Sequence, residues 1–379
     1  MTATIKKNGL GMGRIESSRR RVLAGSLALA AGAFPTPAIV QTRRKVKMAY
    51  GVPTIDSADG GFFNSIPMGA GFYADEGLEV EILTLNGAGA AINMLATGQC
   101  EFTTHGAAGL LAGVGQGVPF RAFIVQVPDN FYSIGVDAES GIKRIEDLKG
   151  KTIGVPALGG SPFVLIKAVI RQLGWDPNKD VTYQAVGVGL PAYDALKRDR
   201  VQAILAWDAP FATYTANGAN LRLFQPNPLP QVGFTHSTNV ALSVLEKEPA
   251  LVASMTRALL RSLIFMAAAP QEELSRLHFK IYPTSRSPGL SDEQLSKVEK
   301  MRMAARLANM RFDKRVFSRE ERLGDETDAR IAIGRDLLFE GGEIKEAAPI
   351  ERYFTRQFLG EVDKIDFAAE IARARAFKA

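Results

Sequence analysis

The sequence contains very few residues of the kinds that form disulfides and metal sites. Its 379 residues include one cysteine, Cys100, and three histidines, at positions 105, 236 and 278. A single cysteine excludes an intramolecular disulfide and a cysteine-rich metal site. The histidines are far apart and show neither HExxH nor His-x-His spacing. We therefore predict that the protein has no metal site and no cofactor.

Extremes of composition and long hydrophobic runs are also absent from the sequence. Apolar residues make up 46% and charged residues 23%, which excludes collagen, a disordered chain and a multi-span membrane protein. The length suits one large domain or two of medium size. Beyond residue 42 no apolar run reaches about 18 residues, so we expect no membrane-spanning helix.

The first 42 residues resemble a bacterial export signal. The segment Ser18-Arg19-Arg20-Arg21-Val22-Leu23-Ala24 has the order of a twin-arginine motif. A short apolar stretch, Val22 to Phe34, follows it, and small residues come next. The stretch is too short to span a bilayer. We therefore expect residues 1–42 to be a twin-arginine-type signal peptide, cleaved between Ala33 and Thr42, that directs the folded protein to the periplasm.

This segment also explains the net charge of +6, which by itself would favour nucleic acid or an anionic membrane as partner. Within residues 1–42, one acidic residue, Glu16, stands against Lys6, Lys7, Arg14, Arg19, Arg20 and Arg21. The segment therefore carries +5, and residues 43–379 carry only +1. Because the mature chain is nearly neutral, we predict no nucleic-acid partner.

Short apolar runs alternate with helical patterns from Lys45 to about residue 243. The runs predict strands at 46–51, 78–85, 101–104, 120–127, 151–155, 181–186, 203–207, 221–224 and 239–243. Helical patterns lie between most of them, including one at 64–76, and such alternation predicts parallel sheets with helices on their faces. From Glu246 to the end the pattern is mostly helical.

The order of these elements predicts two lobes around a cleft. Two α/β halves are joined near residues 132–138 and again near 231–241. If the strand at 239–243 pairs with the first sheet, the chain enters the second lobe and then returns. We predict lobe 1 at 43–134, lobe 2 at 135–235, and a return to lobe 1 with C-terminal helices at 236–379. Two crossings make a hinge, the arrangement of periplasmic binding proteins.

The sequence has no complete catalytic or nucleotide-binding motif. Gly150-Lys151-Thr152 looks like the end of a P-loop, but Ile145 stands where the first glycine is required. Gly159-Gly160-Ser161-Pro162-Phe163 lacks the last glycine of the hydrolase motif G-x-S-x-G. We therefore predict a binding protein and not an enzyme.

Glycine-rich turns follow the predicted strands, and ligands bind at the carboxyl ends of strands in open α/β sheets. These turns contain aspartates and aromatic residues but no lysine or arginine, which favours a planar or partly apolar ligand with hydrogen-bond donors. Phe62 and Trp207 are the preferred stacking residues, although core packing is the alternative for each aromatic side chain. The predicted ligand-binding residues are Asp56, Asp59, Phe62, Gly87, Ala88, Gly89, His105, Gly106, Asp129, Tyr132, Gly160, Ser161, Gly189, Trp207 and Asp208.

Four segments resemble motifs of one family. Gly71–Val80 resembles G-F-F-x-x-x-G-L-x-V, Met94–Phe102 resembles A-L-x-S-G-x-x-D-F, and Glu146–Val155 resembles D-L-K-G-K-x-I-G-V. The segment 174–181, with 195–203, resembles G-x-x-P-x-K-D-V … A-L-x-x-G-x-V-D-A. The chain is thus similar to the nitrate/sulfonate/taurine (SsuA/THI5-like) substrate-binding proteins of ABC importers. The resemblance implies an α/β, type II periplasmic binding protein fold with two parallel-dominated sheets, flanking helices and a helical C-terminal region.

The resemblance also implies a function. We expect a monomeric periplasmic protein that closes its lobes on a small organic molecule and delivers it to the membrane subunits of an ABC permease. The alternatives are a binder of sulfonate- or nitrate-type oxyanions, an extracytoplasmic sensor subunit, and a pyrimidine-forming enzyme, which the lone Cys100 disfavours. An arginine or lysine from the C-terminal helices pointing into the cleft would overturn the preference for a ligand with hydrogen-bond donors and would favour a sulfonate or carboxylate ligand.

Overall fold

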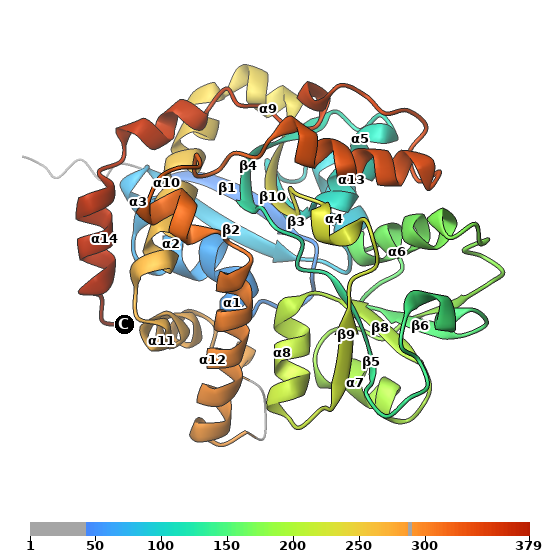
Figure 1. Cartoon of the computed structure of the whole chain (residues 1–379). Coiled ribbons are helices and arrows are strands. Elements are labelled where there is room, and N and C mark those ends of the chain that lie inside the picture. The colour runs from blue at the N-terminus through green and yellow to red at the C-terminus, as the bar shows by residue number, and fades with distance from the viewer. Residues whose placement is uncertain (1–42, 287–289) are drawn as a thin grey trace, which may run out of the picture. The chain divides into compact units, whose positions relative to one another are not determined.

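A computed structural model describes residues 43–286 and 290–379, in which two five-stranded sheets each carry helices (Figure 1). The expected signal segment, residues 1–42, lies outside the described residues. We define lobe 1 by the sheet that contains the first strand and lobe 2 by the other sheet. The two-lobed α/β fold predicted from the sequence is confirmed.

The sheet of lobe 1 has the strand order β2-β1-β3-β10-β4. Strand β10 runs antiparallel to its neighbours β3 and β4, while β1 is parallel to β2 and β3. The chain therefore returns to the first sheet after it has built the second. The strands are β1 (Arg44–Tyr50), β2 (Leu78–Thr84), β3 (Phe102–Gly106), β4 (Phe120–Val127) and β10 (His236–Ala241).

The sheet of lobe 2 has the order β7-β6-β8-β5-β9. Its strands are β5 (Ser133–Asp137), β6 (Thr152–Val155), β7 (Thr182–Ala185), β8 (Ala203–Ala206) and β9 (Leu221–Phe224). Strand β5 lies where the sequence predicted only a crossing between lobes, and it runs antiparallel to β8 and β9. In each sheet one strand opposes the others, so both sheets are parallel-dominated, as predicted.

The helix predicted at 64–76 is interrupted. Asp56 caps an earlier start, since its side chain accepts hydrogen bonds from the N–H groups of Ala58 and Asp59. The helical path is interrupted at Gly71, whose φ of +82° is strained for any residue with a side chain, and it resumes at Phe72. The result is a series of short pieces: α1 (Ser57–Gly60), the π-helix η1 (Gly61–Ser65), α2 (Ile66–Gly69) and α3 (Phe72–Asp75).

The other helices of the two sheets follow the predicted turns closely. Those of lobe 1 are α4 (Ala88–Ala96) and α5 (Ala107–Gly115). Those of lobe 2 are η2 (Ile145–Leu148), α6 (Ser161–Gln172), α7 (Leu190–Lys197), α8 (Asp208–Ala216) and η3 (Leu229–Gln231). Helix α8 starts directly after β8, so the N-terminus of α8 points to the space between the lobes (Figure 1).

The C-terminal region is helical, as predicted. Its helices are α9 (Leu242–Lys247), α10 (Pro249–Ala268), α11 (Gln271–Ile281), α12 (Asp292–Ala308), α13 (Asp328–Glu340) and α14 (Phe367–Arg375), with short pieces η4 (Pro283–Ser285), η5 (Asp313–Phe317), η6 (Ile350–Arg352) and η7 (Leu359–Lys364). Helix α10 is long and apolar enough to cross a membrane, but 67% of its most apolar window is buried inside the protein. It packs as a core helix of lobe 1.

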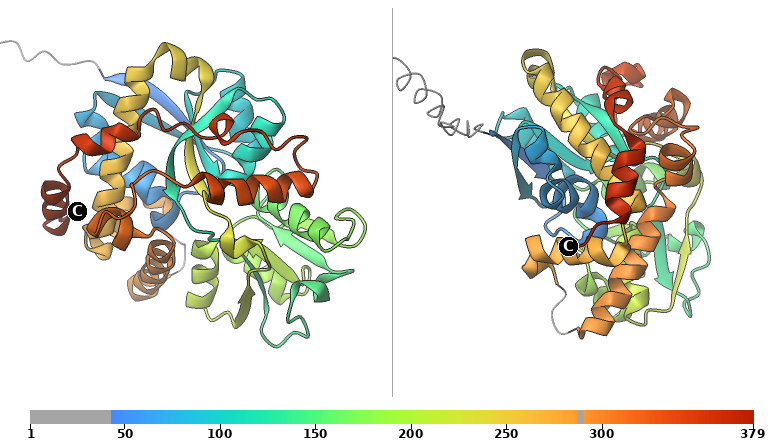
Figure 2. Two further views of the ribbon diagram at one scale, coloured as in Figure 1. Left: turned by 45° about the horizontal axis from the view of Figure 1, so that its top comes forward. Right: turned by 90° about the vertical axis from the view of Figure 1, so that its left-hand side faces the viewer.

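Two of these C-terminal helices contact both lobes (Figures 1 and 2). Helix α12 packs against α8 of lobe 2 and against α1 of lobe 1. Helix α13 packs against α6 of lobe 2 and against α5 of lobe 1. The largest cluster of buried apolar side chains accordingly includes residues of both sheets and of α13. The C-terminal region thus joins the two lobes as well as completing lobe 1.

Candidate ligand-binding site

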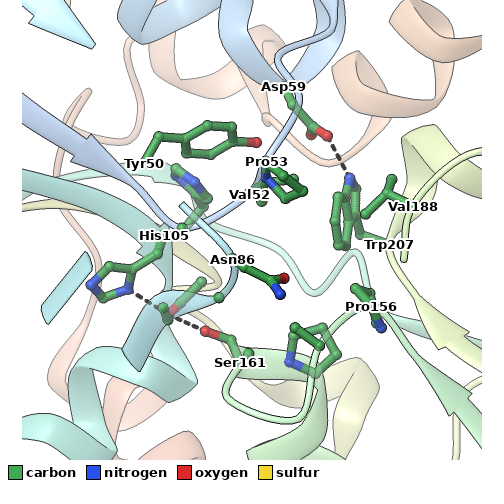
Figure 3. A pocket seen from close by; sticks show the side chains of 18 of the residues that line it. Tyr50, Val52, Pro53, Asp59, Asn86, His105, Pro156, Ser161, Val188 and Trp207 are labelled. Atoms are coloured by element: carbon green, nitrogen blue, oxygen red, sulfur yellow. Dashed lines mark hydrogen bonds between the residues drawn. The ribbon is translucent and has the colours of Figure 1, made fainter. Parts of the chain in front are cut away.

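A cavity lies between the lobes, at the carboxyl ends of β1, β3, β6 and β8 (Figure 3). It encloses about 540 Å³, part of which is open to solvent. Lobe 1 contributes the segment after β1, including Tyr50 and Pro53, and lobe 2 contributes Pro156 and Trp207.

Many of the residues predicted from the sequence meet in this cavity. The members of its wall that were predicted are Asp59, Gly87, Ala88, His105, Gly106, Tyr132, Gly160, Ser161 and Trp207. They come from turns that are up to about 150 residues apart in the chain, because each turn follows a strand that ends at the cleft. Contact of these residues with a ligand stays a prediction.

Three other predicted residues have structural partners outside the cavity. Phe62 is fully buried in lobe 1 and makes an edge contact with Phe63, with ring centroids 5.4 Å apart. Asp129 pairs with Arg330 of α13 at 2.6 Å. Asp56 caps α1 and borders a neighbouring groove. The surroundings of Phe62 therefore fit core packing, which was the alternative interpretation for the aromatic residues.

The remaining predicted residues lie beside the cavity. Gly89 donates its backbone N–H to the carbonyl of Gly159 in lobe 2, at 3.1 Å. Gly189 borders the same groove as Asp56. Asp208 is buried and pairs with Arg306 of α12. Gly89 and Asp208 thus hold parts of the protein together at the edge of the cleft.

The cavity wall also contains residues that the sequence analysis did not select. They are Tyr50, Gly51, Val52, Pro53, Asn86, Phe131, Pro156, Ala157, Pro162, Val188 and His236. Asn86, Phe131 and Pro162 lie inside turns that the sequence singled out, so the strand-end rule could have found them. His236 could not be found in this way, because the polar start of β10 was not recognised as a strand.

Four aromatic side chains form part of the wall of the cavity, among glycine, proline, alanine and valine residues. Phe131 and Tyr132 stack with ring centroids 4.6 Å apart, and Tyr50 and Trp207 are further wall residues. Among the described residues that form the wall there is no lysine or arginine, and Asp59 is the one carboxylate. Such a surface suits a planar ring whose edge carries hydrogen-bond donors.

Asp59 and Trp207 meet across the cleft. The indole Nε1–H of Trp207, at the start of α8, donates to Oδ2 of Asp59 in α1 at 2.6 Å (Figure 3). Burial raises the pKa of Asp59 to about 8, and the nearby Asp56 charge acts in the same direction. Arg306 and the Trp207 hydrogen bond oppose this rise.

The other oxygen of Asp59 is held by a residue that the sequence analysis missed. Nη2 of Arg306, on α12, donates to Oδ1 of Asp59 and also to Oδ1 of Asp208, the latter at 2.6 Å. Its guanidinium lies 4.6 Å from the ring centroid of Phe131, and only 1% of its side chain is exposed. Arg306 is thus a base from the C-terminal helices that reaches the cleft but pairs with its carboxylates and is not part of the cavity wall.

The two histidines of the cavity are uncharged. Burial lowers the pKa of His105 to about 4 and the pKa of His236 well below its usual value. Nδ1 of His105 lies 3.0 Å from the carbonyl oxygen of Gly106, and Nδ1 of His236 lies 3.2 Å from Oε1 of Gln126. In residues 43–286 and 290–379, no cluster of three or more His, Cys, Asp or Glu side chains could hold a metal ion.

Backbone atoms of the two lobes approach closely beside the cavity. Ser161, at the start of α6, donates its hydroxyl to the carbonyl of Gly106 at 2.8 Å and accepts the N–H of Gly109 at 3.1 Å. A Cβ atom at Gly106 would lie 2.1 Å from the hydroxyl of Tyr132 and 2.8 Å from Cβ of Ser161. Only glycine at position 106 allows this fit between the lobes.

A model of the family described as "NMT1/THI5 like" matches residues 69–273. The chain belongs to the NMT1/THI5-like family. This confirms the resemblance seen in the four sequence motifs, all of which lie inside the matched range. The NMT1/THI5-like match ends before α12, so Arg306 belongs to the part of the chain that the family model does not include.

A curated relative is the riboflavin-binding protein RibY of Chloroflexus aurantiacus. It is 28% identical over 254 residues, which cover 65% of this chain and 69% of RibY. The structure of a Bordetella bronchiseptica protein resembles this one with a TM-score of 0.65 and 20% identity, over 85% of this chain and 98% of that one.

Two further solved structures share the fold. The periplasmic aliphatic sulphonate binding protein SsuA of Escherichia coli has a TM-score of 0.53 and 16% identity, over 81% of this chain and 91% of that one. A Candida albicans protein with the periplasmic binding protein fold has a TM-score of 0.57 and 16% identity, over 83% of this chain and 96% of that one. This NMT1/THI5-like chain therefore has the periplasmic binding protein fold, which supports solute binding.

Proposed function

We propose that the protein is the solute-binding component of an ABC importer and that it binds a planar heteroaromatic molecule between its lobes. The observation that carries this proposal is the composition of the cavity wall, where aromatic rings surround the single carboxylate of Asp59. A ring can stack against Trp207 and Phe131 while an N–H group on its edge donates to Asp59. The ligand would thus contact both lobes at once.

An oxyanion ligand fits this wall less well. A sulfonate or nitrate would lie beside Asp59 without a positively charged side chain in the wall, because Arg306 is not a wall residue. The Nη2 of Arg306 binds Asp59 and Asp208, while its buried Nε has no hydrogen-bond partner in the part of the chain that the structure describes. Burial of an unpaired negative charge is unfavourable by several kcal/mol. The name of the relative RibY points in the same direction, because riboflavin has a planar, nitrogen-rich ring system with an imide N–H group on its edge.

Membership of the NMT1/THI5-like family supports a role in transport. Proteins of this fold close two lobes on a ligand and present a joined surface to their partner. We propose that residues 1–42 export this protein to the periplasm by the twin-arginine route. There the monomer would deliver its ligand to the membrane subunits of the importer and would carry out no chemical reaction.

The two tryptophans offer a direct test. The sequence has only Trp175 and Trp207, and Trp175 lies away from the cavity in contact with Lys149. In a Trp175→Phe variant all indole emission comes from Trp207. We expect riboflavin or lumichrome, a flavin ring without a side chain, to quench this emission in a saturable way. In the matched Trp207→Phe variant the ligand should not quench the emission of Trp175 by direct contact, because Trp175 lies outside the cavity.

Thermal-shift measurements with a compound panel complete the test. The panel contains flavins, pterins, pyrimidines, taurine, alkanesulfonates and nitrate. We expect heteroaromatic compounds to raise the melting temperature and the oxyanions to leave it unchanged. If only taurine, alkanesulfonates or nitrate stabilised the protein, the proposed ligand class would be wrong. Turnover of pyridoxal phosphate would instead revive the enzyme alternative.

A further inference from the structure

A second hollow lies next to the aromatic cavity. This groove has a volume of about 1320 Å³, including space open to solvent, and it shares Pro53 of lobe 1 and Val188 of lobe 2 with the cavity. Figure 3 shows Val188 beside Trp207, and in this view Pro53 lies between Tyr50 and Trp207. Pro53 and Val188 therefore lie at the border between the cavity and the groove.

The groove differs from the cavity in its chemistry. Hydroxyl groups of both lobes and of the C-terminal region line it, and they belong to Thr54, Thr84, Thr213, Tyr282, Thr284 and Ser285. Apolar contacts come from Ile82 at the end of β2 and from Val188. The cavity thus suits a flat ring, whereas the groove offers hydrogen bonds along a longer, hydrated path.

Several of these hydroxyls can take a further hydrogen bond. The hydroxyl of Tyr282 donates to Oδ1 of Asn64 at 2.7 Å, so its oxygen can still accept. Thr54 and Thr84 are exposed, and their hydroxyls have no hydrogen-bond partner within residues 43–286 and 290–379. Thr213 is already used, since it donates to the carbonyl of Ala209 and accepts from Arg302.

The charged groups of the groove have hydrogen-bond partners within the protein. Arg302 donates to Glu299 at 2.8 Å, and Arg286 donates to Asp292 at 2.6 Å. The carboxylate of Asp56 accepts backbone N–H groups of α1. A charged substituent would have to compete with these partners, whereas an uncharged hydroxyl can bind beside them.

We propose that the groove binds a flexible, uncharged, hydroxyl-bearing side chain of the same ligand whose ring occupies the aromatic cavity. This inference rests on the proposed function and narrows the ligand to a molecule with two parts: a planar heteroaromatic ring and a short polyol or sugar. Thr84 and Tyr282 contact the side chain, and Pro53 and Val188 form the passage between the two subsites.

Three flavin-class probes separate the subsites. Lumichrome has the ring alone, riboflavin adds an uncharged polyol, and flavin mononucleotide adds a phosphate to the polyol. By isothermal titration, riboflavin should bind the wild type at least about 10-fold more tightly than lumichrome, since each net hydrogen bond contributes about 0.5–1.5 kcal/mol. Flavin mononucleotide should bind more weakly than riboflavin.

The key variant is Thr84→Val, which removes one exposed hydroxyl and keeps the shape and strand preference of the side chain. It should weaken riboflavin binding about 3- to 10-fold and leave lumichrome binding unchanged. The matched control is Thr182→Val, an exposed strand residue of β7 outside the groove, which should change neither. A melting temperature equal to that of the wild type confirms that each variant is folded.

The outcomes distinguish this inference from the proposed function. If lumichrome and riboflavin bound equally, or if Thr84→Val weakened both equally, the groove would not hold the side chain, although ring binding would stand. Tighter binding of flavin mononucleotide than of riboflavin would show that the proposal of an uncharged ligand side chain is wrong. If no heteroaromatic compound bound at all, the proposed function itself would fail.

Discussion

The indole nitrogen of Trp207 in lobe 2 and the carboxylate of Asp59 in lobe 1 form a 2.6 Å hydrogen bond across the cleft. Arg306 of α12 binds the second oxygen of Asp59 and also Asp208, the residue after Trp207. Three segments that are far apart in the sequence therefore depend on one another for their hydrogen bonds. Several of the experiments below act on this cluster, which we call the Asp59–Arg306–Asp208 cluster.

Replacement of Arg306 by methionine should strongly destabilise the protein. The variant leaves two buried carboxylates, Asp59 and Asp208, without their cationic partner. Loss of one partner of a buried ion pair typically costs about 3–5 kcal/mol. Urea unfolding at pH 7 measures the change in the free energy of unfolding.

A matched control for this variant is Arg276→Met. Arg276 pairs with Glu273, but 63% of its side chain is exposed, so its removal should change stability by no more than about 1 kcal/mol. The double variant Arg306→Met with Asp208→Asn should recover part of the loss. Equal effects of Arg306→Met and Arg276→Met would show that the cluster does not stabilise the protein.

Acid should destabilise the protein partly through His105. Burial lowers the pKa of His105 from its ordinary 6.5 to about 4, so the folded protein keeps the ring neutral while the unfolded chain binds a proton below pH 6.5. Stability from this residue is complete above pH 6.5 and is lost as the pH falls towards 4. At about 1.4 kcal/mol per pH unit, the loss approaches roughly 3 kcal/mol.

The comparison of wild type with His105→Asn isolates this contribution. Asparagine cannot titrate, and its amide N–H can still donate to the carbonyl of Gly106. Between pH 7 and pH 4.5 the wild type should lose more free energy of unfolding than the variant, and the other buried groups cancel in the difference. Parallel losses in the two proteins would contradict a lowered pKa at His105.

Alanine at position 106 should hinder the approach of the lobes. The backbone of Gly106 is suited to any residue, so the only obstacle is the contact of a new Cβ with Tyr132 and Ser161. We expect riboflavin binding to weaken at least about 10-fold and the radius of gyration in small-angle scattering to increase. Gly141→Ala is the control, because a Cβ there meets nothing within 4 Å. An unchanged affinity in Gly106→Ala would refute the need for close contact at this point.

Alternation of apolar runs was enough to predict most of the fold from the sequence. It placed nearly all strands within a few residues, because strands such as β4 and β9 are apolar and are bounded by turn residues. It failed at the start of β10, where His236, Ser237 and Thr238 are polar but buried within the sheet. It also failed at Ser133–Asp137, where the sequence predicts a connection between the two lobes and the structure has strand β5.

The candidate site was predictable to the extent that it consists of strand ends. Gly87, His105, Ser161 and Trp207 were found by that rule, and each lines the cavity. Arg306 could not be found, because it comes from a helix about 100 residues beyond Asp208 and no local pattern links them. Phe62 shows a limit of the rule, since it lies in a predicted cleft turn but is fully buried in lobe 1 and does not line the cavity.

Helix α12 gives the cleft a property that a simple hinge lacks. Arg306 binds Asp59 of lobe 1 and Asp208 of lobe 2. Arg302, one turn earlier on the same helix, donates to Thr213 of α8 in lobe 2. Separation of the lobes would strip a buried guanidinium of at least one partner, so half-open arrangements are costly. The protein should therefore switch between a few discrete conformations. The rate of ligand exchange should then be limited by rare opening of the lobes and not by diffusion of the ligand into an open cleft.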